Sequence, residues 1–279
     1  MSYIRSALLI GKNDSVDFHG AMMPDAIVFD MSSPIDEPSV SATLENKIDQ
    51  SKGDVVSSYH VRFPIGASHD LRVKLYPIFS ENIDAVWIAG ISETQQVRDA
   101  DVEIRRLEME HGIKPGTISL IPELNSVGTI SELDGMLTAV DRVAAIALDL
   151  DSVYADLVVT NSGSSDDEFV QRHILAEVAM KVASQNLLLV VTNLDTHLSG
   201  EKIKMIANTG GTGILTQDRD SVASLNHEFT LSSEVIDRAQ TVVDQWSNNA
   251  TRAQEGGVTL QAFMRATHIV GLANRVDAG

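Results

Sequence analysis

Acidic side chains stand at the ends of two neighbouring apolar runs in this 279-residue chain. Glu123 directly follows Leu120-Ile121-Pro122, and Asp149 and Asp151 stand at the end of the next run, Ala144-Leu150. Carboxylates with water in the remaining positions are the ligands that Mg²⁺ prefers in proteins. The sequence therefore makes Glu123, with Asp149 or Asp151, a candidate Mg²⁺ site. The alternative is that these acids lie on the surface or cap helices.

Arg62 is the candidate for binding a substrate carboxylate. It ends another apolar run, and His60 lies on the same side of that run two residues earlier. A planar guanidinium binds a carboxylate through two parallel hydrogen bonds. The alternative for Arg62 is a structural ion pair with a neighbouring acid. We interpret His60 as a residue that lines the interior, with proton transfer as the alternative.

Other polar residues end apolar runs elsewhere in the chain. Lys12 and Asn13 follow the first run, where they either bind an anion of the substrate or cap the next helix. Asp30 either organises a network with its neighbours or caps a turn through its own backbone. Asn193 and Gln217 favour ordinary loop roles, with orientation of substrate as the alternative.

The apolar runs that carry these residues recur at even spacing and mostly lack the alternation of polar and apolar residues. This pattern is typical of strands that are buried on both faces. The eight runs are Ser6-Gly11, Ala26-Met31, Ser57-Phe63, Ala85-Gly90, Thr117-Glu123, Ala144-Leu150, Asn186-Asn193 and Gly210-Thr216.

Segments with a helical period lie between these runs. Val97-Gly112 is charged and amphipathic, and Ser232-Trp246 opens with Ser-Ser-Glu, an N-cap and first turn. Glu168-Ser184 carries one apolar stripe, made of Val170, Ile174, Val178 and Val182. Strands that alternate with helices predict a (β/α)₈ TIM barrel. The rival is a doubly wound open sheet, but Gly11-Lys12-Asn13 is not the glycine-rich turn that usually follows its first strand.

The predicted domain organisation is a barrel over residues 1–250 and a C-terminal helical extension over residues 251–279. An additional helix is expected over Gln261-Arg275. In barrel enzymes the chemistry lies at the carboxyl ends of the strands. The candidate residues above all follow strand-like runs, so the barrel would gather them at one rim.

Composition excludes several classes of function. The chain has 39 acidic and 21 basic side chains and a formal charge of −18, which argues against a nucleic-acid partner because phosphates attract clustered Lys and Arg. No run approaches the roughly 20 apolar residues that a membrane span needs. The absence of cysteine excludes disulfides and thiolate chemistry, and we expect a cytoplasmic protein.

Several short motifs resemble the citrate lyase beta-subunit family of the HpcH/HpaI aldolase superfamily, in that family's order and over nearly the whole chain. They are Arg5-Ser6-Ala7-Leu8, Gly11-Lys12-Asn13, Asp25-Ala26-Ile27-Val28-Phe29-Asp30, His60-Val61-Arg62, Asp84-Ala85-Val86, Ile121-Pro122-Glu123 and Val143-Ala144-Ala145-Ile146-Ala147. The resemblance implies a (β/α)₈ barrel with an additional C-terminal helix, in a trimer or hexamer. It implies that carbon–carbon bonds are made or broken in 2-oxo acids or coenzyme A thioesters, with Mg²⁺ held by a Glu and an Asp.

By this resemblance Arg62 would bind the substrate carboxylate and Glu123 would be the first metal ligand. A gapless match places Ser152 at the position of the family's Asp, so the second ligand stays open between Asp149 and Asp151. The chain also departs from the family elsewhere. Acids are missing after the second strand (Asp30-Met31-Ser32-Ser33) and a lysine after the fourth (Ile88-Ala89-Gly90), and Thr216-Gln217-Asp218 and Gln261-Ala262-Phe263-Met264 replace two later motifs.

Two functions follow from these residues. The preferred one is a carbon–carbon lyase or aldolase-like enzyme acting on a 2-oxo acid or acyl-coenzyme A thioester with Mg²⁺. The alternative is a catalytically degenerate barrel that binds a metabolite or serves as an assembly subunit.

We also expect a homo-oligomer formed through the C-terminal helix, whose apolar stripe includes Phe263, Ile269, Val270 and Leu272. Packing of that helix on its own barrel is the alternative to an oligomer.

Overall fold

Eight parallel strands form the centre of the computed structural model, which describes residues 3–11, 23–31, 58–64, 70–157, 165–194 and 198–277. Each strand pairs with the next in sequence, and the last pairs with the first to close a barrel. Each of the eight predicted runs overlaps one of these strands, so the barrel prediction is confirmed and the open sheet is wrong. The strands are β1 (Ser6–Ile10), β2 (Ala26–Asp30), β3 (Ser58–Pro64), β4 (Ala85–Ala89), β5 (Ser119–Leu124), β6 (Ala145–Asp149), β7 (Leu188–Asn193) and β8 (Gly213–Thr216).

The register of the strands divides their side chains between two faces of the barrel wall. Residues paired across parallel strands share a face, and successive residues alternate. One face carries large buried apolar side chains, which pack beneath the helices: Leu8, Ile27, Val61, Val86, Ile146, Leu189 and Ile214. The other face is the interior, and it carries the polar residues of the candidate site together with both small and large apolar residues: Asp30, Arg62, Glu123, Asp149, Ala7, Ala26, Ala85, Ala147, Val28, Trp87 and Ile121.

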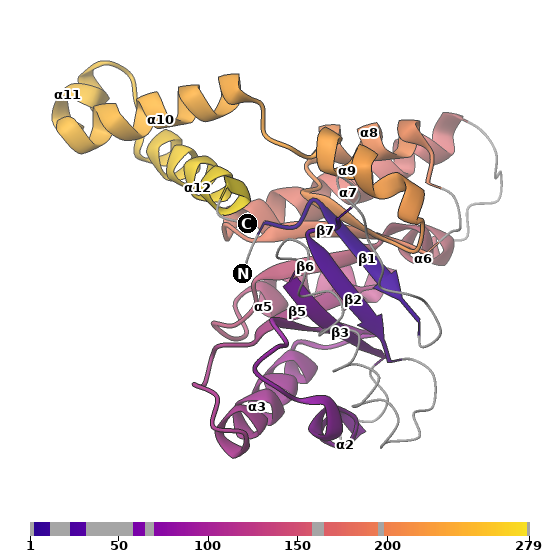
Figure 1. Ribbon diagram of the computed structural model, residues 1–279. Helices are drawn as coiled ribbons and strands as arrows, with labels where there is room; N and C mark the ends of the chain where they lie inside the picture. The colour runs from indigo at the N-terminus through magenta and orange to yellow at the C-terminus, as the bar shows by residue number, and fades with distance from the viewer. Residues whose placement is uncertain are drawn as a thin grey trace. The chain divides into compact units, whose positions relative to one another are not determined.

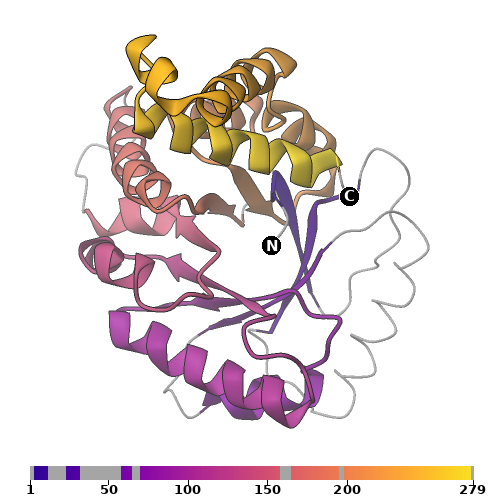
Figure 2. The same cartoon turned by 90° about the vertical axis from the view of Figure 1, so that its left-hand side faces the viewer.

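Helices surround the strands (Figure 1, Figure 2). Two predicted helical segments correspond to α3 and α7, and Ile174, Val178 and Val182 of the predicted stripe on α7 are buried. The helices of this part are α2 (Asp70–Leu75), α3 (Thr94–Glu110), α4 (Val127–Ser131), α5 (Leu133–Leu137), α6 (Leu150–Asp156), α7 (Ser165–Ser184), α8 (Gly200–Thr209) and α9 (Val222–Glu228), with short 3₁₀ helices η2 (Tyr76–Ile78) and η3 (Arg219–Ser221).

The closure between β8 and β1 requires a glycine. A Cβ atom on Gly213 would lie 2.1 Å from the carbonyl oxygen of Ile4 and 2.7 Å from that of Arg5. No side chain fits at those distances, so the two backbones approach closely only because residue 213 has none.

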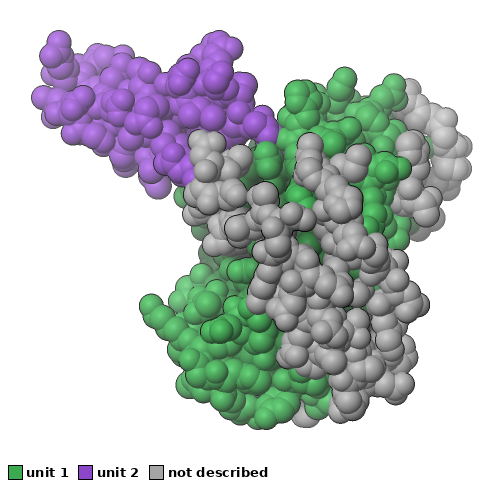
Figure 3. Space-filling view, viewed as in Figure 1, with its two compact units in different colours: residues 1, 3–228 green, residues 2, 229–279 purple. Residues whose placement is uncertain are grey.

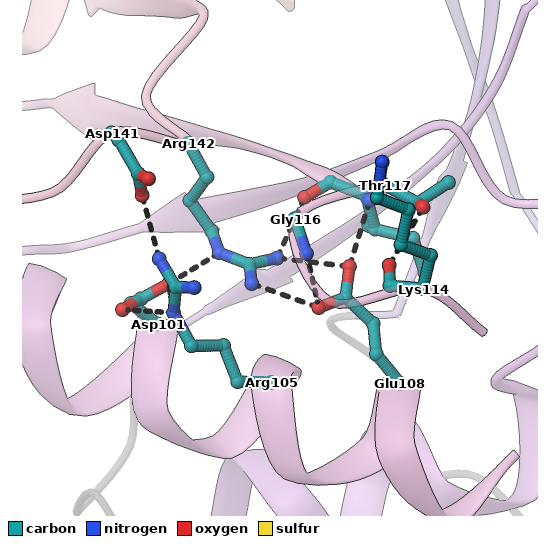
Figure 4. A network of polar contacts seen from close by, with 9 residues as sticks. Asp101, Arg105, Glu108, Lys114, Gly116, Thr117, Asp141 and Arg142 are labelled. Atoms are coloured by element: carbon teal, nitrogen blue, oxygen red, sulfur yellow. Dashed lines mark hydrogen bonds and ion pairs between the residues drawn. The ribbon is translucent and has the colours of Figure 1, made fainter. Parts of the chain in front are cut away.

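A buried ion network joins α3 to the segments that lead into β5 and β6 (Figure 4). The guanidinium of Arg142 donates to Glu108 at 2.9 Å, to the carbonyl of Ile118 at 2.7 Å, and to Asp101. Glu108 also accepts the backbone N–H groups of Gly116 and Ile118, both at 2.9 Å. Burial alone would raise the pKa of Glu108, but these hydrogen bonds outweigh it and lower that pKa. The network anchors the start of β5, the strand that ends in the Pro122-Glu123-Leu124 segment.

The chain forms two compact units, Tyr3–Glu228 with the barrel and Phe229–Gly279 (Figure 3). The second unit contains α10 (Ser233–Asn248), α11 (Ala250–Glu255) and α12 (Leu260–Asp277). In it α10 lies beside α12, and the ring of Trp246 stacks on that of Phe263 at 5.1 Å. The predicted N-cap of α10 is confirmed, since Ser232 accepts the N–H of Val235.

The structure therefore groups α10 with the C-terminal helices, while the division between residues 250 and 251 stays a prediction. Within the described part of the chain, no helix is long and apolar enough to cross a membrane.

Candidate active site

Arg62 and Glu123 form a two-pronged ion pair inside the barrel. Arg62 Nε donates to Glu123 Oε2 at 2.7 Å, and Nη2 donates to Oε1 at 2.9 Å. The two residues come from β3 and β5, which are separated by β4, so only the concave interior allows them to meet. Their side chains are 11% and 1% exposed. The structure thus brings together the predicted carboxylate-binding arginine and the predicted first metal ligand, as partners of each other.

Asp30 and Asp149 complete the charged group around this arginine. Arg62 Nη1 lies 3.6 Å from Asp30 Oδ1, and Asp30 is paired with Arg62 in the register of β2 and β3. Burial by itself lowers the pKa of Arg62, but the hydrogen bond and attraction to Glu123, together with attraction to Asp30 and Asp149, outweigh it and raise that pKa. Among the described residues, three carboxylates therefore act on this one guanidinium.

Asp149 is also the N-cap of α6. Its Oδ1 accepts the backbone N–H of Ser152 at 3.0 Å, and its Oδ2 accepts the Ser152 hydroxyl at 2.7 Å. Ser152, which the gapless match places at the family's metal-binding position, thus lies against Asp149. A carboxylate oxygen has two lone pairs, so these bonds leave acceptor capacity on Asp149.

Asp151 lies in a different setting. It belongs to the first turn of α6, its side chain is 43% exposed, and its Oδ2 forms an ion pair with Lys202 of α8 at 2.7 Å. No contact between Asp151 and the Arg62–Glu123 pair is seen among the described residues. Lys12 and Asn13, together with Ser32 and Ser33, lie outside the described residues.

His60 lies two residues before Arg62 on β3, and its imidazole is neutral. The indole Nε1–H of Trp87 donates to His60 Nδ1 at 2.9 Å. Since an indole N–H can only donate, Nδ1 must be the unprotonated nitrogen and Nε2 carries the proton. Burial lowers the pKa of His60 to about 3. This geometry supports the lining interpretation and argues against proton transfer through His60.

Thr192 is a residue that sequence reasoning missed. It is paired with Asp149 in the register of β6 and β7 and so faces the interior. Its hydroxyl is buried and has no hydrogen-bond partner among the described residues, and the same is true of Nε2 of His60. A single threonine in a strand carries no signal that sequence alone could single out.

Asn193, by contrast, points to the opposite face of β7, where both its amide atoms are buried and unpartnered within the described chain.

The donor atoms at this rim fit Mg²⁺ in chemical type. Glu123, Asp149 and Thr192 offer only oxygen, which hard dications prefer, and His60 cannot ligate through a protonated Nε2. Within the described residues there is no group of three or more His, Cys, Asp and Glu that could hold a metal ion. Mg²⁺ commonly uses one or two protein carboxylates plus water and substrate oxygens, so Glu123 and Asp149 are sufficient in number.

A closed parallel barrel with an arginine and several carboxylates at the carboxyl ends of its strands defines the class: a (β/α)₈ barrel with a polar site at the rim where such proteins carry out chemistry. No protein-family model matches the sequence, and no curated protein matches it.

Solved structures with the same fold do exist. Malate synthase from Haloferax volcanii, in its lead(II) complex, has a TM-score of 0.67 and 12% identity, over 99% of this chain and 92% of that one. The citrate lyase beta subunit from M. tuberculosis, complexed with oxaloacetate and magnesium, has a TM-score of 0.57 and 13% identity over 82% and 98% of the two chains. RipC from Yersinia pestis has a TM-score of 0.61 and 12% identity over 84% and 98%.

This chain therefore has the fold of the citrate lyase beta subunits, which confirms at the level of the fold the resemblance seen in the sequence motifs.

Proposed function

We propose that this protein is a carbon–carbon lyase or aldolase-like enzyme that acts on a 2-oxo acid or an acyl-coenzyme A thioester with Mg²⁺. The observation that carries the proposal is the meeting of Arg62 and Glu123 inside the rim of the barrel, with Asp149 within electrostatic reach. Further support comes from proteins of the same fold, whose structures contain magnesium with oxaloacetate, magnesium with glyoxylate, or pyruvate with acetyl-coenzyme A.

Glu123 and Asp149 are the residues that would hold Mg²⁺, with Asp151 as the alternative second ligand. When bound, Mg²⁺ supplies a Lewis acid that polarises the carbonyl group of a 2-oxo acid. Arg62 would bind and orient the substrate carboxylate through its fork of N–H donors. Lys12 and Asn13 follow β1 in the chain and are proposed as further contacts to the anionic substrate.

The second candidate function is a barrel that binds a metabolite, or serves in an assembly, without catalysis. One observation favours it: both carboxylate oxygens of Glu123 are engaged by Arg62. A permanent ion pair of this kind would serve structure and leave neither residue for a ligand. The two functions differ in whether Glu123 binds a cation.

Calorimetric titration of Mg²⁺ into the wild type and Glu123→Gln, with and without oxaloacetate or pyruvate, tests the proposal. We expect Mg²⁺ binding that Glu123→Gln removes and Asp134→Asn retains, since Asp134 is an exposed acid of α5 paired with Lys181. Mass spectrometry of a panel of 2-oxo acids and acyl-coenzyme A thioesters then identifies a bond cleaved or formed. If wild type does not bind Mg²⁺, or if Glu123→Gln binds it as well as wild type does, the result favours the non-catalytic barrel.

The proposal extends to the setting of the protein. We propose a cytoplasmic homo-oligomer, a trimer or hexamer, whose partner is a small carboxylate substrate. Helix α12 supports an oligomer because Leu260 and Met264 lie exposed on it.

A further inference from the structure

The present contacts of Arg62 oppose the binding of a substrate carboxylate. A guanidinium offers two edges for two-pronged binding: Nε with Nη2, and Nη1 with Nη2. Glu123 occupies the first edge, at 2.7 and 2.9 Å. Asp30 Oδ1 lies 3.6 Å from Nη1, one of the two nitrogens of the second edge, which is an ion-pair distance but not a hydrogen bond. A substrate carboxylate would have to displace Glu123 at the first edge, and it would meet the negative charge of Asp30 near the second.

Glu123 is restricted in the same way. Both its oxygens accept from Arg62, and its side chain is almost completely buried. A dication approaching these oxygens would meet a positive guanidinium within hydrogen-bonding distance of them. In a buried site this like-charge repulsion is poorly screened.

We propose that cation binding and carboxylate binding at this site are coupled through an exchange of partners by Arg62; this inference rests on the proposed function. Glu123 exchanges the guanidinium for the cation, and the guanidinium exchanges Glu123 for the substrate carboxylate. Each ligand favours binding of the other, since the cation gives Glu123 a new positive partner and the substrate offers Arg62 a new anion. The Arg62–Glu123 ion pair thus blocks the cation site on Glu123 and the carboxylate site on Arg62 until both ligands are present.

Reciprocal coupling is the measurable consequence. If one ligand raises the affinity of the other by some factor, the reverse effect has the same factor, and couplings of this kind are typically about 5–150-fold. We expect the dissociation constant of wild type for Mg²⁺ to fall at least about fivefold in saturating pyruvate, and that for pyruvate to fall equally in saturating Mg²⁺. Calorimetry measures both, with pyruvate as a 2-oxo acid that lacks a second carboxylate.

Two variants each remove one partner of the Arg62–Glu123 ion pair. Glu123→Gln removes the anion that holds Arg62, so we expect it to bind pyruvate without Mg²⁺ at least about fivefold more tightly than wild type does, and to ignore added Mg²⁺. Arg62→Gln removes the cation that holds Glu123, so we expect it to bind Mg²⁺ more tightly than wild type in the absence of pyruvate. Asp141→Asn is the matched control, because it removes one negative charge at an exposed position that pairs with Arg105.

Thermal unfolding of each variant checks that it is folded. Arg62→Gln leaves a buried acid without its partner, and if that variant does not fold, Glu123→Gln decides alone. The coupling is wrong if Glu123→Gln binds pyruvate no better than wild type without Mg²⁺, or if pyruvate leaves a Glu123-dependent Mg²⁺ affinity unchanged. In that second case the proposed function stands. If neither ligand binds wild type, alone or together, both proposals fail.

Discussion

At the residue scale, the interior of the barrel contains charged and polar groups where apolar side chains would be the stable choice. Transfer of Arg62 and Glu123 from water carries a desolvation penalty that their attraction only partly offsets, and apolar replacements of such pairs are often neutral or stabilising. His60 and Thr192 add buried polar atoms without partners among the described residues. Such features weigh against a purely structural origin for this group, because an unpaired buried donor destabilises the fold.

His60 makes the stability of the protein depend on pH. Its pKa in the folded protein is about 3, and a histidine in the unfolded chain has a pKa of about 6.5. The unfolded state therefore binds a proton between these values while the native state does not. The stabilisation is fully present above about pH 6.5 and is lost as the pH falls, at roughly 1.4 kcal/mol per pH unit.

Urea denaturation from pH 7 to pH 5 measures this contribution. We expect His60→Gln, which can still accept from Trp87 but does not titrate, to lose less stability over that range than wild type. Thr192→Val is the control, because it alters the same interior without adding or removing a titrating group. Equal pH slopes for wild type and His60→Gln would show that His60 is not held neutral by burial.

At the scale of the elements, buried ion pairs and hydrogen bonds connect α3 to the segments that lead into β5 and β6. Arg142, whose side chain is 1% exposed, is the common partner of Asp101 and Glu108 of α3 and of the Ile118 carbonyl (Figure 4). Glu108 in turn accepts two backbone N–H groups of the segment before β5. The orientation of α3 and the position of β5, which carries Glu123, are therefore set together.

Removal of Arg142 tests this connection. Arg142→Ala leaves Glu108 buried without a countercharge from the described part of the chain, and such a loss costs about 3–5 kcal/mol of the free energy of unfolding. Arg105→Ala is the matched control: Arg105 pairs with the same Asp101 and with Asp141, but it is solvent-accessible, so its loss costs about 1 kcal/mol or less. Urea denaturation at pH 7 compares the two. A similar small loss for both would contradict the role given to Arg142.

At the scale of the whole molecule, the C-terminal unit buries little of its apolar surface. Among its described residues, the buried apolar side chains are mostly alanines: Phe229, Ala239, Ala253, Ala266, Leu272 and Ala273. Of the stripe predicted on α12, Leu272 is buried, whereas Phe263, Ile269 and Val270 remain partly accessible. Apolar side chains exposed on one helix favour association with a further surface.

The oligomer predicted through α12 is tested by substitution on that helix. Leu260 and Met264 are 55% and 51% exposed, so changing both to Glu does not disturb a core. We expect light scattering at micromolar concentration to give a multiple of 30.2 kDa for wild type and a smaller mass for the double variant. Phe169→Glu, at an exposed position of α7, is the control and leaves the mass unchanged. A wild-type mass of 30.2 kDa would contradict the oligomer.

The eight strands and the face of α7 that packs inward follow from sequence alone. Strands buried on both faces require continuous apolar runs, and an amphipathic helix requires its stripe, so these patterns are local and can be recognised without the fold. The positions of Arg62, Glu123 and Asp149 at the ends of such runs are local in the same sense. Those positions were enough to predict that the three side chains share one rim.

The partners of these residues depend on the tertiary structure. Asp149 and Asp151 differ by two positions in sequence, yet Asp149 acts on Arg62 from the end of β6, whereas Asp151 of α6 pairs with Lys202 of α8. Whether Glu123 meets a lysine, a water or Arg62 depends on strand register and barrel curvature, which join residues 61 positions apart. The hydrogen bond of Trp87 to His60 and the position of Thr192 opposite Asp149 arise in the same way, because strand pairing is a long-range contact that no local pattern encodes.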